Sequence, residues 1–547
     1  MKRHSIFVLF LVLAGASASL NPALAATPVK GGTFYRHIDF DPVTLNPITK
    51  TDQYSQWVLS YILSTLLTVN PDTYAWEPGL ATKWEIAKDG KTFTFHLRKG
   101  VKWHDGVPFT ADDVKFSFDV YFEGKWIAPQ KKLYFEKIKE VIVIDPYTVK
   151  FIVKEPYFKN FEVVVSNFLP IIPKHFYSGA DVNDPKFNKQ VIGTGPYKLE
   201  EWERGQHITL KRNEDFFGKD DPVNKGWYNF DKIFFRPVSQ IEVAVELLKK
   251  GNLDFIDLSR NPDQFVEKTK GEEWGPGKKL VAVKAENSAP DNFDYGFVAW
   301  NEKHPFFGDR DVRMAMSHLI NRDVMIDKFR YGMSVKATGP FGNKSPSSSP
   351  KVKPVEFDQN EALKLLQKAG WKLQGEKLLK TIDGKEPPFE FTIICANPAF
   401  ERYLTLMKED MKKVGITLNI KMLEWNSFIK LIDERKFDAA NMAWSVGSLE
   451  SDPKQVWHSA EIAPPGHNFA GWSNKKADEL IEKIERTLDP KTRRGYYHQL
   501  HEIIAAEQPY SFLFNRKYTL YSHTARIKKP KDLFKYDLGY DAWWVGE

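Results

Sequence analysis

Cysteine is almost absent from the chain: among 547 residues, only Cys395 carries a thiol. A single cysteine excludes an intramolecular disulfide and a paired-cysteine zinc site. Cys395 lies in the largely apolar run 389–396, which favours a buried thiol in a strand over a catalytic nucleophile. The stability of the fold must therefore come from packing.

Long apolar runs are also missing, apart from a short one at the N-terminus. Residues 6–14 are apolar but too few to cross a bilayer, and they follow the basic residues Lys2 and Arg3. The small-residue pattern Ala23-Leu24-Ala25 then fits a signal-peptidase site. We expect residues 1–25 to be a signal peptide cleaved after Ala25, and the mature chain to be exported and soluble.

Charge of one sign is not concentrated anywhere in the sequence. The 78 Lys and Arg residues nearly balance the 71 Asp and Glu residues, and the formal net charge is +7. The densest basic cluster is the short KKPK segment at 528–531, which fits a solvated turn. A nucleic-acid-binding protein usually gathers Lys and Arg on one face or arm, so we expect no nucleic-acid partner.

Catalytic motifs are absent as well. The chain has neither a phosphate-binding G-x-x-x-x-G-K-[ST] loop nor a G-x-S-x-G elbow, and the GTG segment at 193–195 lacks the third glycine of a dinucleotide site. His498 and His501 match no zinc-binding helix motif, which favours a solvated helix face. No pair of carboxylates stands out for glycoside hydrolysis. We expect no enzymatic activity, no cofactor and no metal.

What the chain does contain is typical of a large α/β protein that binds a ligand. Its composition is 42% hydrophobic, 27% charged and 14% aromatic, and its length suggests about three domains. Alternating residues predict a hairpin over 83–97, and a β-α-β pattern covers 233–256. Helical periodicity predicts helices that include 54–67 and one long helix over 309–331.

One stretch of the sequence is specific enough to suggest a family. The runs GLATKWE at 79–85 and DGKTFTFHLRKGVKWHDGVPFTADDV at 89–114 resemble the signature of the family-5 extracellular solute-binding proteins. Further blocks follow in the order of that family: GTGPY at 193–197, KGNLD at 250–254, DVRMAMS at 311–317, AGW at 369–371 and DP at 452–453. The resemblance covers nearly the whole mature chain.

The resemblance implies a two-lobed periplasmic-binding-protein fold of the α/β class, similar to class II, with an additional inserted α+β domain. By this analogy the chain divides into lobe I, an inserted domain and lobe II. The expected ranges are 26–68, 190–285 and 512–547 for the discontinuous lobe I, 69–189 for the inserted domain, and 286–511 for lobe II.

The resemblance also implies the residues that meet the ligand. In peptide-binding members an Asp three residues after a lobe II Trp meets the ligand amino terminus. The matching Trp here is Trp444, but the third residue after it is Gly447, so Glu450 or Asp452 is the candidate carboxylate. Further candidates are Trp425 and Asn441 in lobe II and Thr51, Asp52 and Gln53 in lobe I.

The function that follows is capture of peptides between the lobes and delivery to the permease subunits of an ABC importer in the inner membrane. We expect a monomer. Other solutes stay open as ligands, namely an oligosaccharide, a nickel chelate or haem, because stacking aromatics also suit sugars. An exported hydrolase or a periplasmic chaperone on the same lobes is the alternative from another class.

Overall fold

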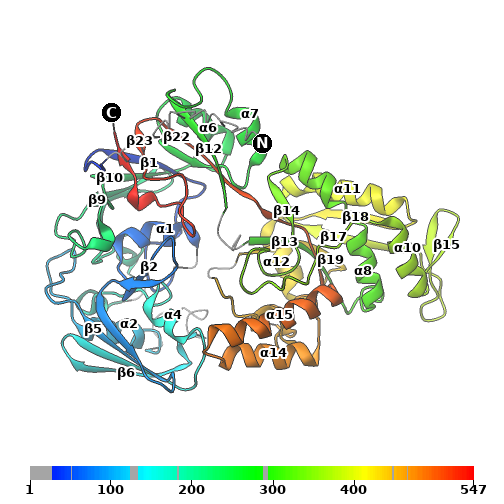
Figure 1. Cartoon of the computed structure of the whole chain (residues 1–547), viewed down its shortest axis with the longest axis horizontal. Helices are drawn as coiled ribbons and strands as arrows, with labels where there is room; N and C mark the ends of the chain where they lie inside the picture. The colour runs from blue at the N-terminus through cyan, green and yellow to red at the C-terminus, as the bar shows by residue number, and fades with distance from the viewer. Residues whose placement is uncertain are drawn as a thin grey trace, which may run out of the picture.

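Three large sheets organise the protein. The computed structural model describes residues 27–50, 52–123, 134–181, 184–287, 294–445, 449–464 and 466–546. Within these residues the chain forms a seven-stranded, a five-stranded and a four-stranded sheet, together with four two-stranded pairs. Figure 1 shows the seven- and five-stranded sheets on opposite sides of the view, with the four-stranded sheet below the first. The fold is mixed α/β.

The seven-stranded sheet gathers strands from both ends of the chain. The central strand β1 pairs in parallel with β10 and β11, while the outer strands run antiparallel. The strands in spatial order are β12 (Leu280–Glu286), β22 (Tyr518–Thr524), β11 (Phe255–Asp257), β1 (Thr33–Ile38), β10 (Lys232–Pro237), β9 (His207–Arg212) and β8 (Tyr197–Glu203). Its helices are α1 (Gln53–Ile62), α6 (Ile241–Lys249) and α7 (Pro262–Lys268).

The five-stranded sheet belongs to the other lobe. Its strands in order are β18 (Thr417–Met422), β17 (Glu390–Cys395), β19 (Ala439–Ser445), β13 (Asp294–Trp300) and β20 (Tyr510–Phe512). The helices of this half are α8 (Arg310–His318), α9 (Arg322–Val324), α10 (Gln359–Lys368), α11 (Glu401–Lys412), α12 (Trp425–Asp433), α13 (Lys454–Trp457), α14 (Lys475–Arg486) and α15 (Pro490–Glu507).

The four-stranded sheet is antiparallel, as the alternation over 83–97 predicted. Its order is β4 (Ala81–Ile86), β5 (Thr92–Leu97), β7 (Thr148–Val153) and β6 (Ile138–Asp145), with helices α2 (Ala111–Asp119), α4 (Asn160–Val165) and α5 (Lys174–Tyr177). The buried Asp113 carboxylate accepts bonds from the Thr110 and Lys174 N–H groups, each 2.9 Å away. These bonds cap the start of α2 and tie it to the start of α5.

The two-stranded pairs are short additions to these units. They are β2 (Leu67–Val69) with β3 (Trp76–Pro78), β14 (Ser334–Lys336) with β21 (Phe514–Arg516), β15 (Lys372–Gln374) with β16 (Lys377–Leu379), and β23 (Ile527–Lys528) with β24 (Trp544–Val545).

Two of the predicted helices are wrong in extent. Helix α1 ends at Ile62, because Leu63 is extended and Leu67 already pairs in β2. The long helix predicted over 309–331 is broken after His318: the side chain of Asn321 accepts a bond from the Val324 N–H and starts a new helical turn. Residues Met325–Phe329 then form a π-helix. Local capping overrides the apolar periodicity here.

The chain crosses between the two large sheets at two adjacent places. Strand β12 pairs with β22 along its whole length, and beyond it the Asn287 N–H donates to the Lys517 carbonyl at 3.0 Å. After β20 in one sheet and β21 in a separate pair, the chain enters β22 of the other sheet. Paired crossing segments of this kind permit the lobes to move as bodies.

We propose to keep the expected division of the chain, with one adjustment. Each sheet has its own hydrophobic cluster, which supports lobe I, the inserted domain and lobe II as separate units. Strand β20 continues to Phe512 in the five-stranded sheet, one residue beyond the expected boundary at 511. We therefore place the return to lobe I between β21 and β22.

The GTGPY block joins the inserted domain to lobe I. A Cβ on Gly193 would lie 1.8 Å from the Ile62 carbonyl oxygen, so only glycine fits this approach. The Gly193 N–H donates to His104 Nδ1 at 3.3 Å, so His104 Nε2 donates to the Gly195 carbonyl at 3.1 Å. Burial lowers the pKa of His104 to about 4, which keeps the imidazole neutral.

Cys395 and His501, both considered in the sequence analysis, are buried. The Cys395 thiol lies 3.5 Å from Asn441 Oδ1, and burial raises the pKa of this thiol, as expected for a core residue. The prediction of a solvated face was wrong for His501: its ring is buried, and Nδ1 accepts from the Ser349 N–H at 2.9 Å. His498 Nε2 contacts the Pro346 carbonyl at 2.9 Å.

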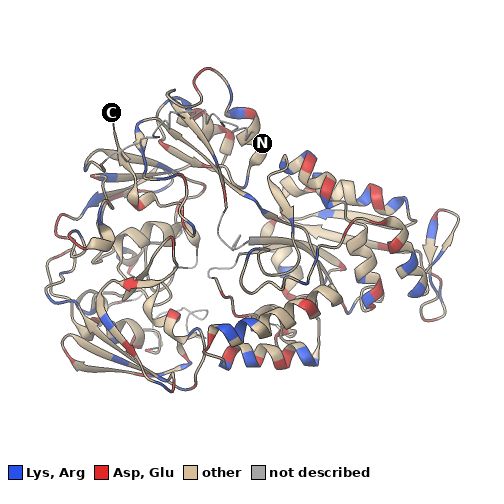
Figure 2. Ribbon diagram, viewed as in Figure 1, with Lys and Arg blue, Asp and Glu red and all other residues tan. Residues whose placement is uncertain are grey.

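The surface of lobe II carries charges of both signs. Figure 2 shows Lys and Arg interspersed with Asp and Glu along α14 and α15. Among the helices of the described residues, none has the length and apolar character needed to span a bilayer. The predicted signal peptide lies outside the described residues.

Candidate functional site

A cavity of about 270 Å³ lies between the inserted domain and lobe II. Its walls are mainly aromatic and come from both units. The rings that line it are Tyr134, Tyr157 and Phe168 from the inserted domain and Tyr295, Phe341, Trp444, Trp457 and His467 from lobe II. The cavity thus combines apolar stacking surfaces with a few polar groups, as binding sites for small ligands generally do.

Trp444 is one of the predicted site residues that line this cavity. It lies near the end of β19, opposite Tyr295 of β13, and is half-buried. Its ring stacks on Phe469 at 5.6 Å between centroids and lies 5.9 Å from His467. Packing on Phe469 fixes the indole as a wall of the cavity.

Asp452 supplies the carboxylate of the cavity. Its Oδ2 accepts a bond of 2.7 Å from the Tyr157 hydroxyl, and its Oδ1 accepts one of 2.9 Å from the Lys454 N–H. Among the described residues, no side-chain nitrogen of Lys, Arg or His lies within 4.0 Å of this carboxylate. A carboxylate that is held by neutral donors and faces a cavity is suited to a cationic ligand group.

Glu450, the other candidate carboxylate, is already paired. Its Oε2 accepts from Arg493 Nε at 3.0 Å and also contacts Arg493 Nη2. The same guanidinium donates to the carbonyls of Thr487 and Leu488 and lies over the Phe158 ring. Glu450 therefore ties the loop before Asp452 to the first turn of α15, through Arg493, and does not line the cavity.

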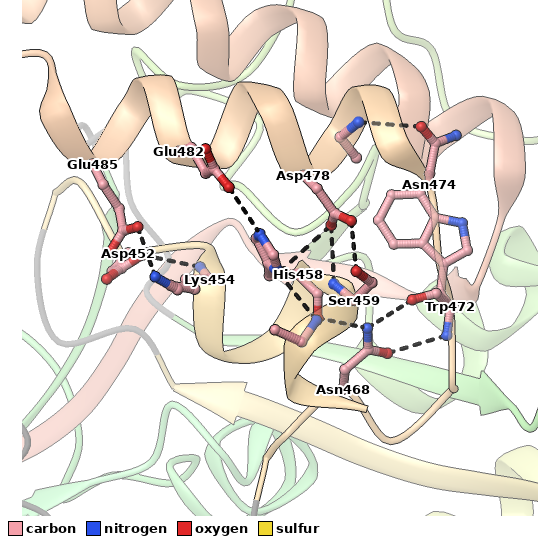
Figure 3. A network of polar contacts seen from close by, with 12 residues as sticks. Asp452, Lys454, His458, Ser459, Asn468, Trp472, Asn474, Asp478, Glu482 and Glu485 are labelled. Carbon is pink, nitrogen blue, oxygen red and sulfur yellow. Dashed lines mark hydrogen bonds and ion pairs between the residues drawn. The ribbon is translucent and has the colours of Figure 1, made fainter. Parts of the chain in front are cut away.

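A polar network holds the segment after Asp452 against α14 (Figure 3). The Asp478 carboxylate accepts from the Ser459 N–H at 2.9 Å and from the Ser459 hydroxyl at 2.6 Å. Asn468 donates to the His458 and Trp472 carbonyls at 3.2 and 2.8 Å. These bonds fix the backbone from which Asp452 and α13 project, so the carboxylate has a rigid support.

Glu485 of α14 neutralises the two lysines beside the cavity. Its carboxylate lies 3.1 Å from Lys137 Nζ and 2.9 Å from Lys454 Nζ. Burial acts to raise the pKa of Glu485, but the two ammonium groups outweigh it and the pKa is lowered. Both lysine ammonium groups are thereby paired with Glu485.

The remaining lobe II candidates lie outside this cavity. Trp425 begins α12 with 60% of its surface exposed and stacks on Phe428 at 5.9 Å. Asn441 is buried in β19, where its side-chain amide donates to the Phe297 carbonyl at 3.1 Å. Asn441 thus bridges β19 and β13 within the sheet.

The lobe I candidates surround the start of α1. Asp52 is the N-cap of this helix: its carboxylate accepts from the Ser55 N–H at 2.8 Å and contacts the Ser55 hydroxyl. Gln53 is the exposed first residue of α1. Thr51 and Gly447 lie outside the described residues.

The contribution of the inserted domain was not predicted from the sequence. Tyr134, Tyr157, Lys159 and Phe168 all line the cavity, but no sequence motif marks any of them as a ligand-contacting residue. The only local signal is the density of aromatic residues after the strand that ends at Val153.

One group of side chains in the described residues has a spacing compatible with a metal ion. The ligand atoms of Glu201, Glu203 and His207 lie within 4.8 Å of one another on the β8–β9 hairpin. His207 Nε2 is 3.2 Å from Glu201 Oε2, and both glutamates are exposed. The three side chains lie together on a hairpin at the edge of the seven-stranded sheet, remote in sequence from the cavity residues.

Comparison with known proteins decides the family. The model of the bacterial extracellular solute-binding proteins, family 5, matches residues 75–460. The chain belongs to this family. The matched range contains both the signature run and most of the residues that line the cavity, so the family membership covers the candidate site.

Individual relatives extend the match to the whole chain. The oligopeptide-binding protein AppA of Bacillus subtilis (strain 168) is 28% identical over 566 residues, covering 99% of this chain and 97% of AppA. The structure of AppA in complex with a nonapeptide matches with a TM-score of 0.76 and 26% identity, covering 95% of this chain and 100% of that one.

The same fold also occurs in proteins with other ligands. NikZ from Campylobacter jejuni, solved in complex with Ni(L-His), matches with a TM-score of 0.74 at 24% identity, covering 94% of this chain and 99% of that one. At this level of identity the likeness shows the fold alone.

Proposed function

We propose that this solute-binding protein captures peptides in the periplasm and delivers them to the permease of an ABC importer. The observation that supports this most directly is Asp452, a carboxylate with no cationic partner among the described residues, set in an aromatic cavity. A peptide amino terminus supplies the missing positive charge, and the surrounding rings suit the adjoining side chain.

The size of the cavity suits one end of an extended ligand. Pockets that hold a whole small ligand usually measure roughly 300–1,000 Å³, and the volume here is about 270 Å³. We propose that the amino-terminal residue of the peptide occupies this cavity. The rest of the main chain then continues between the lobes and is covered when they close.

We assign different roles to the predicted site residues. Asp452 and Trp444 contact the ligand, whereas Glu450 supports the loop through Arg493. Trp425 and Gln53 are exposed, one on each lobe, and contact the ligand in the closed form. Asn441 and Asp52 act indirectly, because they hold the Phe297 carbonyl and the Ser55 N–H in place.

We infer that the protein is a carrier without catalytic activity. Removal of residues 1–25 after export gives the mature periplasmic monomer, and ATP hydrolysis belongs to other subunits of the importer. Binding energy that is available only when both lobes touch the peptide favours the closed form. The permease then distinguishes loaded from empty protein by its shape.

Native mass spectrometry of protein purified gently from the periplasm tests this function. We expect a series of bound masses that denaturation releases as short peptides with free amino termini. A single bound mass corresponding to a metal chelate, a haem or an oligosaccharide would contradict peptide binding and assign the cavity to that solute.

A further inference from the structure

A closed ring of contacts links Asp452 to the inserted domain and back to lobe II. The Tyr157 hydroxyl donates to Asp452 Oδ2 at 2.7 Å, and Lys137 Nζ lies 3.4 Å from the centroid of the Tyr157 ring. Lys137 Nζ also lies 3.1 Å from Glu485, whose carboxylate is 2.9 Å from Lys454 Nζ. The Lys454 N–H returns to Asp452 Oδ1 at 2.9 Å.

Two domains contribute to this ring. Lys137 and Tyr157 belong to the inserted domain, whereas Asp452, Lys454 and Glu485 belong to lobe II. Figure 3 shows the lobe II part, with Asp452 beside Lys454 and the Lys454 ammonium directed to Glu485 on α14. The Phe158 N–H also donates to the Glu485 carbonyl at 3.1 Å, so backbone contacts reinforce the junction.

Tyr157 is held in one orientation. Its side chain is 5% exposed, and its ring makes an edge contact with Phe158 at 5.3 Å between centroids. The Lys137 ammonium over the ring face adds a cation–π contact. Burial and, after it, the charge of Asp452 raise the pKa of Tyr157, so the hydroxyl stays protonated and acts as the donor.

We propose that Tyr157 is a positioning residue that fixes the Asp452 carboxylate for the ligand ammonium, so that the inserted domain sets the selectivity for a free amino terminus. This inference rests on the proposed function. The Lys454 N–H holds one oxygen of the carboxylate and Tyr157 holds the other, and these two bonds restrain its rotation. Binding therefore loses less side-chain freedom than it would with a mobile anchor.

Two neighbouring carboxylates, Glu485 and Glu162, pair with lysines that lie near Asp452. Lys454 is close enough in sequence to pair with Asp452, but Glu485 takes its ammonium group instead. Lys159, which also lines the cavity, contacts Glu162 Oε2 at 2.7 Å. The ring thus positions the anchor with neutral donors and leaves its negative charge for the ligand.

The test compares Tyr157→Phe with Tyr134→Phe. Tyr134 lines the same cavity from the same domain, but its hydroxyl accepts from Gln455 Nε2 at 3.1 Å and does not contact Asp452. The probes are the tripeptide Ala-Phe-Ala and its N-acetylated form, titrated by calorimetry into ligand-free protein. Thermal unfolding of each variant checks that the fold is retained.

We expect Tyr157→Phe to lower the affinity for the free tripeptide by roughly two- to tenfold and to leave the affinity for the acetylated form unchanged. Tyr134→Phe should preserve the ratio of the two affinities. In an Asp452→Asn background, Tyr157→Phe should have no further effect on that ratio, because the two residues act as a unit.

Three results would overturn the role of Tyr157: an equal loss for both probes, no change for either, or a gain for the free tripeptide, which would show competition with the ligand. In each of these three cases the control is the unaltered protein, which still binds the free tripeptide more tightly than the acetylated one. If the unaltered protein binds neither probe, the proposed function fails and the role of Tyr157 fails with it.

Discussion

Replacing Asp452 by Asn is expected to reduce the affinity for free-amino peptides by roughly 30- to 1,000-fold, about 2–4 kcal/mol. The carboxylate lines the cavity and has no cationic partner within 4.0 Å among the described residues. Asn keeps the shape of the side chain but removes the charge that pairs with the ligand ammonium. Calorimetric titration with Ala-Phe-Ala and its N-acetylated form measures the effect.

Glu450→Gln is the matched control for this prediction, because Glu450 lies two residues earlier in the same loop. Gln still accepts a hydrogen bond from Arg493, so we expect unchanged affinity for both peptides and only a lower stability. Loss of free-amino affinity in Glu450→Gln, together with normal binding by Asp452→Asn, would reverse the assignment of the two carboxylates.

Replacing Asp254 by Ala is expected to destabilise lobe I by about 3–5 kcal/mol. This carboxylate is 1% exposed and accepts bonds from the Tyr35 N–H at 2.9 Å, the Thr524 hydroxyl at 2.7 Å and the guanidinium of Arg526. It joins β1 to the C-terminal strand of the same sheet. Its removal leaves a cation and two further donors without their acceptor.

Thermal and urea unfolding measure this loss of stability. Asp119→Ala serves as the control, because Asp119 forms an exposed i,i+4 pair with Lys115 that should contribute less than about 1 kcal/mol. Equal stability of the two variants would contradict the structural role of Asp254, which is the last residue of the KGNLD block.

The parts of the fold that the sequence predicted are those that depend on local pattern. The hairpin over 83–97 follows from alternation of apolar and polar residues, and it occurs as β4 and β5. The helix predicted over 309–331 failed because its apolar spacing continues across Asn321, whose capping bond to the Val324 N–H interrupts the helix. Hydrophobic periodicity indicates which face of a helix is buried, but it does not show where a capping bond interrupts the helix.

Only part of the candidate site could be predicted from the sequence. The resemblance suggested Trp444 as a site residue. Because the loop after it differs from the family pattern, both Glu450 and Asp452 were candidates for the carboxylate that meets the ligand. The choice between them depends on Arg493, which lies 43 residues after Glu450 and pairs with it in space. Likewise, no sequence pattern connects Tyr157 with Asp452, because 295 residues separate them.

The burial of polar residues also could not be predicted from the sequence. His501 lies on α15 with a spacing that suggested a solvated face, yet the loop containing Ser349 covers it and donates a backbone N–H to its ring. The contact exists only because a loop 152 residues earlier returns to the helix. Long-range contacts of this kind need a three-dimensional structure.

Calorimetric titration of the unaltered, ligand-free protein tests the central claim most directly. The account predicts saturable one-to-one binding of free-amino peptides and clearly weaker binding of the same peptides after N-acetylation. Equal affinity for both forms would contradict the role of Asp452. Binding of a nickel–histidine chelate or an oligosaccharide, with no binding of any peptide, would contradict the proposed function as a whole.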